Sequence, residues 1–244
     1  MKYRPSIIPT CLFFLLAALP ALAGTEEGVE VIQEIESPIT GKAPARFTTK
    51  SLPPWMRIEM KDSVTLVNST SGDIITLLPS QKAYIRIPGG VAQKMKDLAS
   101  RFQPAESAEQ PAPEAPPEFE PTGRKETIQG YECGEYRVKK GGESLAVWIA
   151  KDPAAAALFR EYLQMLASSQ SDKDPLAFTR EPLEMIPPDL GLPVRVDYQA
   201  GPASVSMTLI SVKKQKFDPA EFAPPHDYKP LSLPGGIGDL LKAN

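Results

Sequence analysis

His226 is the only histidine in the chain, so any mechanism that needs a histidine as general acid or base must use it. It follows two prolines in a segment that we expect at the surface. With Cys133 it would form a Cys–His nucleophilic site, but nothing in the sequence brings the two residues together. Cys133 stands in an alternating strand pattern as a small hydrophobic residue would. A structural role is favoured for both, and the sequence leaves open whether Cys133 is free or joins another chain.

Other groups capable of chemistry are scattered. Glu132 and Glu135 flank Cys133, but single strand glutamates normally point to solvent. Residues 235–238 (GGIG) lack the preceding strand and following long helix of a phosphate loop. Asn68-Ser69-Thr70 matches a glycan acceptor and equally a tight turn. Two cysteines and one histidine also exclude most zinc sites. We therefore predict no enzyme, no metal and no cofactor.

Methionine and aromatic side chains form a more suggestive set, because they fall on the expected apolar faces of strands and helices. Methionine adapts its shape to variable apolar ligands. Ordinary core packing is the alternative explanation. The candidate lining of an apolar ligand site consists of Met56, Met60, Tyr84, Met95, Phe102, Trp148, Phe159, Tyr162 and Met165.

Composition excludes several classes of protein. The 244 residues include 27 Lys and Arg against 30 Asp and Glu, a net charge of −3. A nucleic-acid partner is disfavoured, because phosphate neutralisation needs an excess of basic residues. Two cysteines cannot build a disulfide framework. The 27 prolines indicate many turns, strand edges and at least one linker.

Residues 1–23 are typical of a secretory signal peptide. Lys2 and Arg4 precede an apolar run that ends in Ala21-Leu22-Ala23, and small residues at these positions favour cleavage after Ala23. The run is shorter than the roughly 20 residues that span a bilayer. An uncleaved membrane anchor is the alternative. Lipidation is rejected, because Cys11 lies at the start of the run. We expect an exported protein, periplasmic or extracellular, that does not span the membrane after cleavage.

The first half of the mature chain reads as strands followed by one helix. Met56, Ile58 and Met60 alternate with polar or less apolar neighbours, the pattern of a half-buried strand. Short apolar runs at 64–68, 74–78 and 83–87 suggest an antiparallel meander. Glycine and prolines within 39–54 weaken the strand pattern there. Apolar residues from Val91 to Phe102 recur at helical spacing, which predicts a helix over 91–102.

Residues 103–123 have a different character, rich in proline and glutamate and without Lys or Arg. Such a segment cannot bury enough apolar surface to offset its ordering entropy. We expect a disordered acidic linker here. A docking segment for a basic partner is the alternative.

The second half repeats the order of strands and helices. Asp152-Pro153 is a strong helix start, because Asp caps free amides and Pro at the first position loses no needed donor. We predict a helix over 153–167, a short helix over 174–182, one helical turn from 218, and strands within 127–138, 145–149, 192–198 and 204–214. The prediction is an α+β fold, a curved antiparallel sheet with helices 91–102 and 153–167 across one face. It comprises one domain over 24–230 and a flexible tail over 231–244.

Several segments in order resemble one family. Residues 123–133 contain an I-x-G-Y-x-C strand, and residues 217–228 contain a D-x-x-x-F-x-x-P-x-x-Y pattern. The segments 147–152 and 192–194 resemble two other strands of the family. Residues 73–88 resemble its hairpin ending in K-x-Y. The family is the exported bacterial domain of unknown function 4412, and the resemblance spans most of 50–230.

That family is similar in architecture to the periplasmic lipoprotein carriers (LolA-like), in which a half-barrel sheet and helices enclose an apolar concavity. The resemblance implies binding of an acyl chain or a lipidated partner. One hypothesis is therefore a non-catalytic envelope protein that holds an apolar ligand between sheet and helices, with a lipid or lipoprotein as partner. The other is an envelope interaction or scaffolding protein with a filled core, no ligand and a protein partner.

Overall fold

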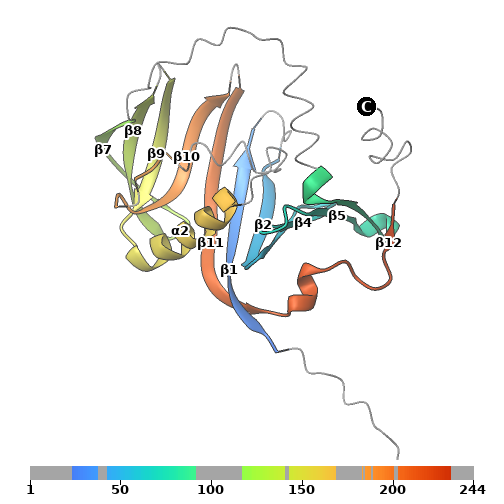
Figure 1. Cartoon of the computed structure of the whole chain (residues 1–244). Coiled ribbons are helices and arrows are strands. Elements are labelled where there is room, and N and C mark those ends of the chain that lie inside the picture. The colour runs from blue at the N-terminus through green and yellow to red at the C-terminus, as the bar shows by residue number, and fades with distance from the viewer. Residues whose placement is uncertain are drawn as a thin grey trace, which may run out of the picture.

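A computed structural model describes residues 24–37, 43–91, 117–140, 143–168, 183, 185–187, 189–200 and 203–231. The signal peptide predicted over 1–23 lies outside them. The strands form one open twelve-stranded sheet in the order β12-β6-β5-β4-β3-β2-β1-β11-β10-β9-β8-β7. Figure 1 shows that this sheet is curved and that helix α2 lies against one face. The expected large antiparallel sheet with few helices is thus confirmed.

The first half forms a meander in which each strand pairs with the next. The strands predicted at 64–68, 74–78 and 83–87 are confirmed, and a further strand forms within 39–54. The turn at Asn68 is held by its side chain, whose Oδ1 accepts from the backbone N–H of Thr70 at 2.9 Å and of Ser71 at 2.8 Å. The elements are β1 (Glu26–Glu36), β2 (Ala45–Leu52), β3 (Trp55–Glu59), β4 (Val64–Asn68), β5 (Ile74–Leu78), the short 3-10 helix η1 (Pro79–Gln81) and β6 (Ala83–Ile87).

The second half is joined to the first by the antiparallel pairing of β1 with β11. This ladder runs from Glu26 opposite Phe217 to Glu36 opposite Ser206, with one irregularity after Ile32. Because it covers the whole of β1, it makes one continuous sheet of the two halves. The strands are β7 (Glu118–Ile128), β8 (Tyr131–Lys140), β9 (Glu143–Ala150), β10 (Leu192–Ala200) and β11 (Ala203–Phe217).

The prediction of a disordered linker over 103–123 was wrong at the C-terminal end of this segment. Residues 118–123 belong to β7, where Glu118 to Pro121 pair with Lys139 to Tyr136 of β8. Phe119 packs against the main core, and Glu120 lies 3.2 Å from Lys139 Nζ. Pro121 lies on the last strand of the sheet and next to a register irregularity, which are the places where proline occurs within sheets. The remainder of the predicted linker, 103–116, lies outside the described residues.

The helix predicted over 153–167 is confirmed as α2 (Pro153–Ser168). Asp152 caps it, since Oδ1 accepts from the N–H of Ala155 at 2.9 Å. Its strand contacts are concentrated on β1, β10 and β11. The predicted helices over 91–102 and 174–182 lie outside the described residues, apart from Val91, which is helical. No helix within the described ranges is long and apolar enough to cross a membrane.

The chain after β11 returns across the first half of the sheet. Asp218 caps the predicted helical turn, the 3-10 helix η2 (Pro219–Phe222), in a capping box with Glu221. The short β12 (Lys229–Pro230) then pairs with β6 in parallel. Of the tail predicted over 231–244, only Leu231 is among the described residues.

Candidate functional site

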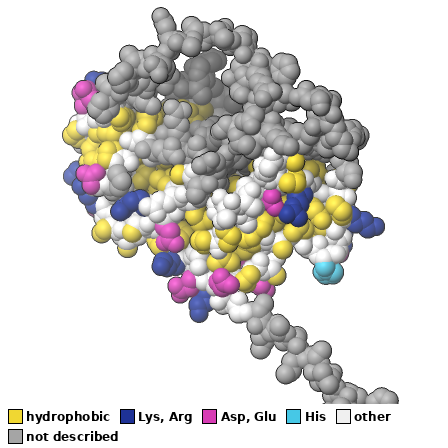
Figure 2. Space-filling view, in the orientation of Figure 1, with side chains coloured by type: hydrophobic (Ala, Val, Ile, Leu, Met, Phe, Trp, Pro, Cys, Tyr) yellow, Lys and Arg dark blue, Asp and Glu magenta, His cyan; other side chains and the backbone are white. Residues whose placement is uncertain are grey.

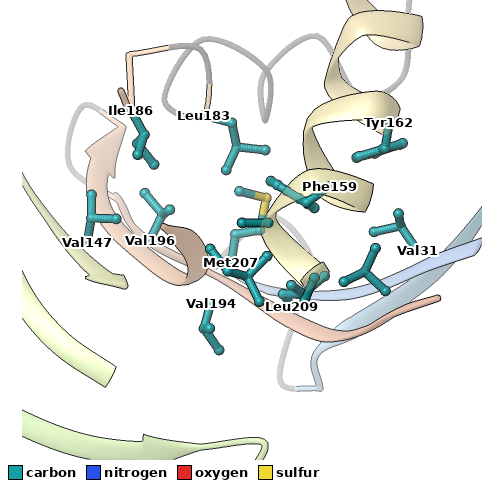
Figure 3. Packing of buried hydrophobic residues seen from close by; sticks show 14 of the residues in the cluster. Val31, Val147, Phe159, Tyr162, Leu183, Ile186, Val194, Val196, Met207 and Leu209 are labelled. Atoms are coloured by element: carbon teal, nitrogen blue, oxygen red, sulfur yellow. The ribbon is translucent and has the colours of Figure 1, made fainter. Parts of the chain in front are cut away.

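The two faces of the sheet differ in what covers them. Successive strand residues point to opposite faces, and residues paired in register share a face. We call the face covered by α2 the helix face; it carries Val31, Val147, Val196, Met207 and Leu209. Figure 3 shows Phe159 and Tyr162 of α2 on the side of Met207, Leu209 and Val31, and Ile186 near Val147 and Val196. The opposite side is called the outer face.

Beneath α2 the helix face is a packed core. Phe159 and Tyr162 are at most 2 % exposed, and their ring centroids lie 5.6 Å apart. Tyr162 Oη donates to Oε1 of Gln33 at 3.2 Å. Gln33 Nε2 in turn donates a hydrogen bond to the sulfur of Met207 at 3.5 Å. The side chains under the helix therefore fill the space, including a buried glutamine whose polar groups are matched.

Beyond α2 the helix face continues over β2 to β5 as two parallel rows of side chains. The register gives the first row as Val29, Ser51, Met56, Val67 and Ile74, and the second as Val31, Thr49, Ile58, Thr65 and Thr76. We call the part of these rows on β2 to β5 the distal rows. They contain no charged residue, because Lys50, Arg57 and Glu59 alternate onto the outer face. The distal rows are thus apolar apart from hydroxyl groups.

Two of these hydroxyl groups lack hydrogen-bond partners. Thr49 is 0 % exposed and Ser51 is 3 % exposed, and neither Oγ1 of Thr49 nor Oγ of Ser51 has a partner among the described residues. A buried hydroxyl without a partner costs about 1–3 kcal/mol. Two such groups on one strand and one face therefore form an unusual feature of this core.

The outer face of the first half is covered by the returning chain. Phe217 and Phe222 pack on Leu52 and Trp55 of β2 and β3. Lys50 Nζ lies 2.8 Å from Glu221 Oε2 and 3.2 Å from Glu59 Oε1. Burial by itself lowers the pKa of Lys50, but these two carboxylates outweigh it and the pKa is raised. This side of the meander is closed by apolar contacts and ion pairs.

The outer face of the second half is polar and hollowed. A pocket of about 480 Å³ lies along β8, β9 and β10, lined among others by Arg124, Glu135, Arg137 and Asp197. Glu135 accepts from Thr122 Oγ1 at 2.6 Å and from Arg124 Nη1 at 2.9 Å. Its carboxylate is therefore engaged in structural contacts, which does not indicate general acid–base chemistry.

Two more outer-face residues, Asp197 and Trp148, also contact neighbouring side chains. Asp197 Oδ1 accepts from Ser206 Oγ at 2.6 Å, and Oδ2 accepts from Arg195 Nε at 3.2 Å. Arg195 also forms a two-pronged contact with Glu126, at 3.1 and 3.3 Å. Its guanidinium carbon lies 4.7 Å from the ring centroid of Trp148, which gives a cation–π contact.

Cys133 and His226 lie far apart in the strand order. Cys133 is on β8, next to one edge of the sheet, whereas His226 precedes β12 at the other edge. Cys133 is 3 % exposed, and burial raises the pKa of its thiol, which lowers its reactivity. His226 is exposed, as Figure 2 shows. The described residues contain no group of three or more His, Cys, Asp or Glu that could hold a metal ion.

The candidate lining residues fall into several environments. Met56, Phe159 and Tyr162 are buried in the core of the helix face, and Met165 packs against it. Trp148 is buried, but in register it faces Arg195 on the outer face. Met95 and Phe102 lie outside the described residues.

Two further candidates, like Trp148, do not lie on the helix face. Met60 is 38 % exposed, because β3 ends at Glu59 and Met60 begins the turn to β4. Tyr84 pairs in register with Leu77 and packs against an outer-face cluster with Tyr228. A single strand pattern cannot tell which of the two faces the returning chain will cover.

Four residues on the helix face were not singled out from the sequence. They are Gln33, Thr49, Ser51 and Thr65, all at most 5 % exposed. For Thr49 and Ser51 the signal was alternation in β2, where Phe47, Thr49 and Ser51 share a face. The prolines and glycine around this strand concealed it.

Comparisons with known proteins give both sequence and structural matches. Among solved structures, PNGF-II is 13% identical with a TM-score of 0.34, and the match covers 89% of this chain and 33% of that one. MucB in complex with MucA is 9% identical with a TM-score of 0.37, covering 85% and 57%. This chain thus spans a third of PNGF-II and little more than half of MucB.

A LolA superfamily protein from Nitrosomonas europaea is 9% identical with a TM-score of 0.29, covering 83% of this chain and 91% of that one. All three TM-scores lie well below 0.5, so these likenesses carry no functional inference. Curated protein sequences give no match. The family model described as Domain of unknown function (DUF4412) matches residues 32–228. This match covers most of the chain and confirms the predicted resemblance, and the protein belongs to that family.

Proposed function

We propose that the protein is an exported, non-catalytic envelope protein that binds an apolar ligand, an acyl chain or a lipidated partner, against the helix face. The observation that carries this proposal is the extent of the helix face. The strand contacts of α2 are concentrated on β1, β10 and β11, whereas the apolar pattern of the helix face continues across β2 to β5. The curved sheet would act as a half-barrel around the ligand.

The proposed lining combines strand and helix residues. Met56, Ile58 and Val67 supply the apolar surface of the distal rows, and all three are at most 2 % exposed. Met165 of α2, which is partly buried, lies at the border of the core. Methionine side chains at two of these positions suit ligands of variable shape. Phe159 and Tyr162 belong to the packed core beneath α2, where the proposed lining ends.

Export is part of the proposal and rests on residues 1–23. Cleavage after Ala23 would make Gly24 the first residue of the mature protein, directly before β1. Intact mass of the protein from the periplasm or the medium checks this. A mass that includes residues 1–23 would contradict export by cleavage and support a retained anchor.

Native mass spectrometry of the mature protein, purified from its host without detergent, tests ligand binding. The expected result is an adduct of lipid size that is released by organic solvent. Refilling of the emptied protein with a naphthylamine dye provides the second measurement. An empty mass together with no dye binding would overturn the proposal.

The second candidate function is an interaction or scaffolding protein with a filled core. The close packing of Phe159, Tyr162 and Gln33 beneath α2 favours it, because this part of the helix face has matched polar and apolar contacts. Crosslinking in the envelope distinguishes the two. A protein partner that is lost on deletion of residues 104–116, without any bound lipid, would support the scaffold.

A further inference from the structure

The pocket on the outer face of the second half lies where one small side chain stands between two larger ones. The register places Ala146 of β9 between Arg137 of β8 and Asp197 of β10, and all three line the pocket. In the next row of the same face, the residue of β9 is the much larger Trp148, which is buried. The volume of about 480 Å³ is in the range of small-molecule sites, about 300–1,000 Å³. The pocket therefore has room for a ligand.

The two carboxylates that line this pocket are already paired with arginines. Glu135 lies 2.9 Å from Arg124, and Asp197 lies 3.2 Å from Arg195. Each of the four carboxylate oxygens accepts one hydrogen bond from a described residue. A carboxylate oxygen has two lone pairs. Both carboxylates can therefore accept further hydrogen bonds, in particular from hydroxyl groups of a ligand.

Arg137 is the cation of the pocket that lacks such a partner. Its side chain forms no hydrogen bond or ion pair with any other residue in the described ranges. Its register neighbour on β7, Glu120, pairs with Lys139 instead. The other arginines on the described strands all pair with a carboxylate; they are Arg46, Arg57, Arg86, Arg124 and Arg195. The pocket thus offers one uncompensated positive charge beside several hydrogen-bond acceptors.

We propose that this pocket binds a carboxylate that carries several hydroxyl groups, which is the chemistry of a sugar acid. The guanidinium of Arg137 pairs with the ligand carboxylate, because its planar fork matches carboxylate geometry. Hydroxyl groups of the ligand donate to Glu135 and Asp197, and the hydroxyl of Ser204 at the rim can donate to them in turn. The site goes beyond the proposed function and is independent of it, because it lies on the face opposite α2.

Calorimetric titration of the mature protein with three small molecules tests each part of the inference. D-galacturonate has both the carboxylate and the hydroxyl groups, galactose lacks the carboxylate, and cyclohexanecarboxylate lacks the hydroxyl groups. The wild type is expected to bind galacturonate more tightly than either of the others. Arg137→Gln keeps hydrogen-bonding groups and removes the charge. Its affinity for galacturonate should fall about ten-fold, while its affinity for galactose is unchanged.

Two further variants serve as controls. Arg160 is exposed on α2, so Arg160→Gln removes the same charge away from the pocket and should leave all affinities unchanged. Ala146→Leu fills the hollow and should abolish the binding of galacturonate and of galactose. Circular dichroism checks that Ala146→Leu is folded. Arg137 is exposed, so Arg137→Gln tests the inference even if Ala146→Leu does not fold.

The linear trimer of galacturonate separates two sources of the ligand. Tighter binding of the trimer than of the monomer indicates an acidic polysaccharide, and equal binding indicates a free sugar acid; sensitivity of either to Arg137→Gln supports the inference. The inference is overturned if galacturonate does not bind, if cyclohexanecarboxylate binds as tightly, or if Arg137→Gln and Arg160→Gln bind galacturonate equally. None of these outcomes bears on the apolar ligand of the helix face.

Discussion

Tyr162 of α2 donates a hydrogen bond of 3.2 Å to the side-chain oxygen of Gln33 on β1, in the interior of the protein. Both residues are at most 2 % exposed. This contact joins the helix to the strand that links the two halves of the sheet. It orients α2 on the helix face more specifically than apolar packing alone, because a buried polar group tolerates little displacement from its partner.

Removal of this hydrogen bond should destabilise the fold. Tyr162→Phe leaves Oε1 of Gln33 buried without this donor, and we expect a loss of about 1–3 kcal/mol in the free energy of unfolding. Urea denaturation followed by circular dichroism measures it. In Gln33→Leu Tyr162 loses this acceptor instead, so the double variant should lose less than the sum of the two single losses. Strict additivity would contradict the coupling.

The two methionines of the β3 region should respond differently to truncation. Met56 is 1 % exposed in the core, whereas Met60 is 38 % exposed in the turn after β3. Met56→Ala should cost about 2–5 kcal/mol, because it removes buried atoms and leaves a cavity. Met60→Ala should change stability by less than about 0.5 kcal/mol. Equal losses in urea denaturation would contradict the assigned strand end.

Cys133 should be unreactive in the folded protein. Burial raises the pKa of its thiol, so less thiolate is present at neutral pH than in an exposed cysteine. Iodoacetamide labelling of the mature protein, followed by mass spectrometry, should proceed slowly and accelerate on addition of urea. Rapid labelling in buffer would show that β8 opens readily. A dimer lost on reduction would show that the thiol bonds another chain.

Acid should weaken the ion pairs of Glu59 with Arg57 and Lys50 on the outer face and so destabilise the fold. Burial by itself raises the pKa of Glu59, but Arg57 at 2.6 Å and Lys50 at 3.2 Å outweigh it, so the pKa is lowered from 4.5. A carboxyl with a lowered folded pKa adds stability above its unfolded pKa, and this stability is lost as the pH falls through the folded value. The free energy of unfolding should therefore decrease from about pH 5 downward.

Variants assign this acid sensitivity to Glu59. In Glu59→Gln the decrease of stability between about pH 5 and pH 3 should be smaller than in the wild type, because one titrating group is absent. Glu132→Gln, at an exposed position, is the matched control and should follow the wild-type profile. A Glu59→Gln profile parallel to the wild type would show that other carboxyls carry the effect.

Much of the local structure was determined by the sequence alone. Asp152-Pro153 marked the start of α2 because capping and a missing N–H are local effects. The alternation of Met56 and Ile58 marked β3, because side chains alternate along any strand. The motifs from 123 to 133 and from 217 to 228 indicated the family, which the match over 32–228 confirms. The C-terminal end of the linker was predicted wrongly. The strand at 118–123 forms by pairing with β8, and the local proline- and glutamate-rich composition does not reveal this pairing.

Only the tertiary structure decided which face each strand residue joins. Tyr84 and Trp148 had the same apolar strand signal as Met56, but the returning chain and Arg195 cover them on the outer face. The unpaired hydroxyls of Thr49 and Ser51 likewise emerge only when β1, β2 and β3 are in register, because a hydroxyl in a strand is ordinary until its neighbours exclude water. The periodicity of the sequence shows which residues of a strand share a face of the sheet. Long-range pairing decides what lies against it.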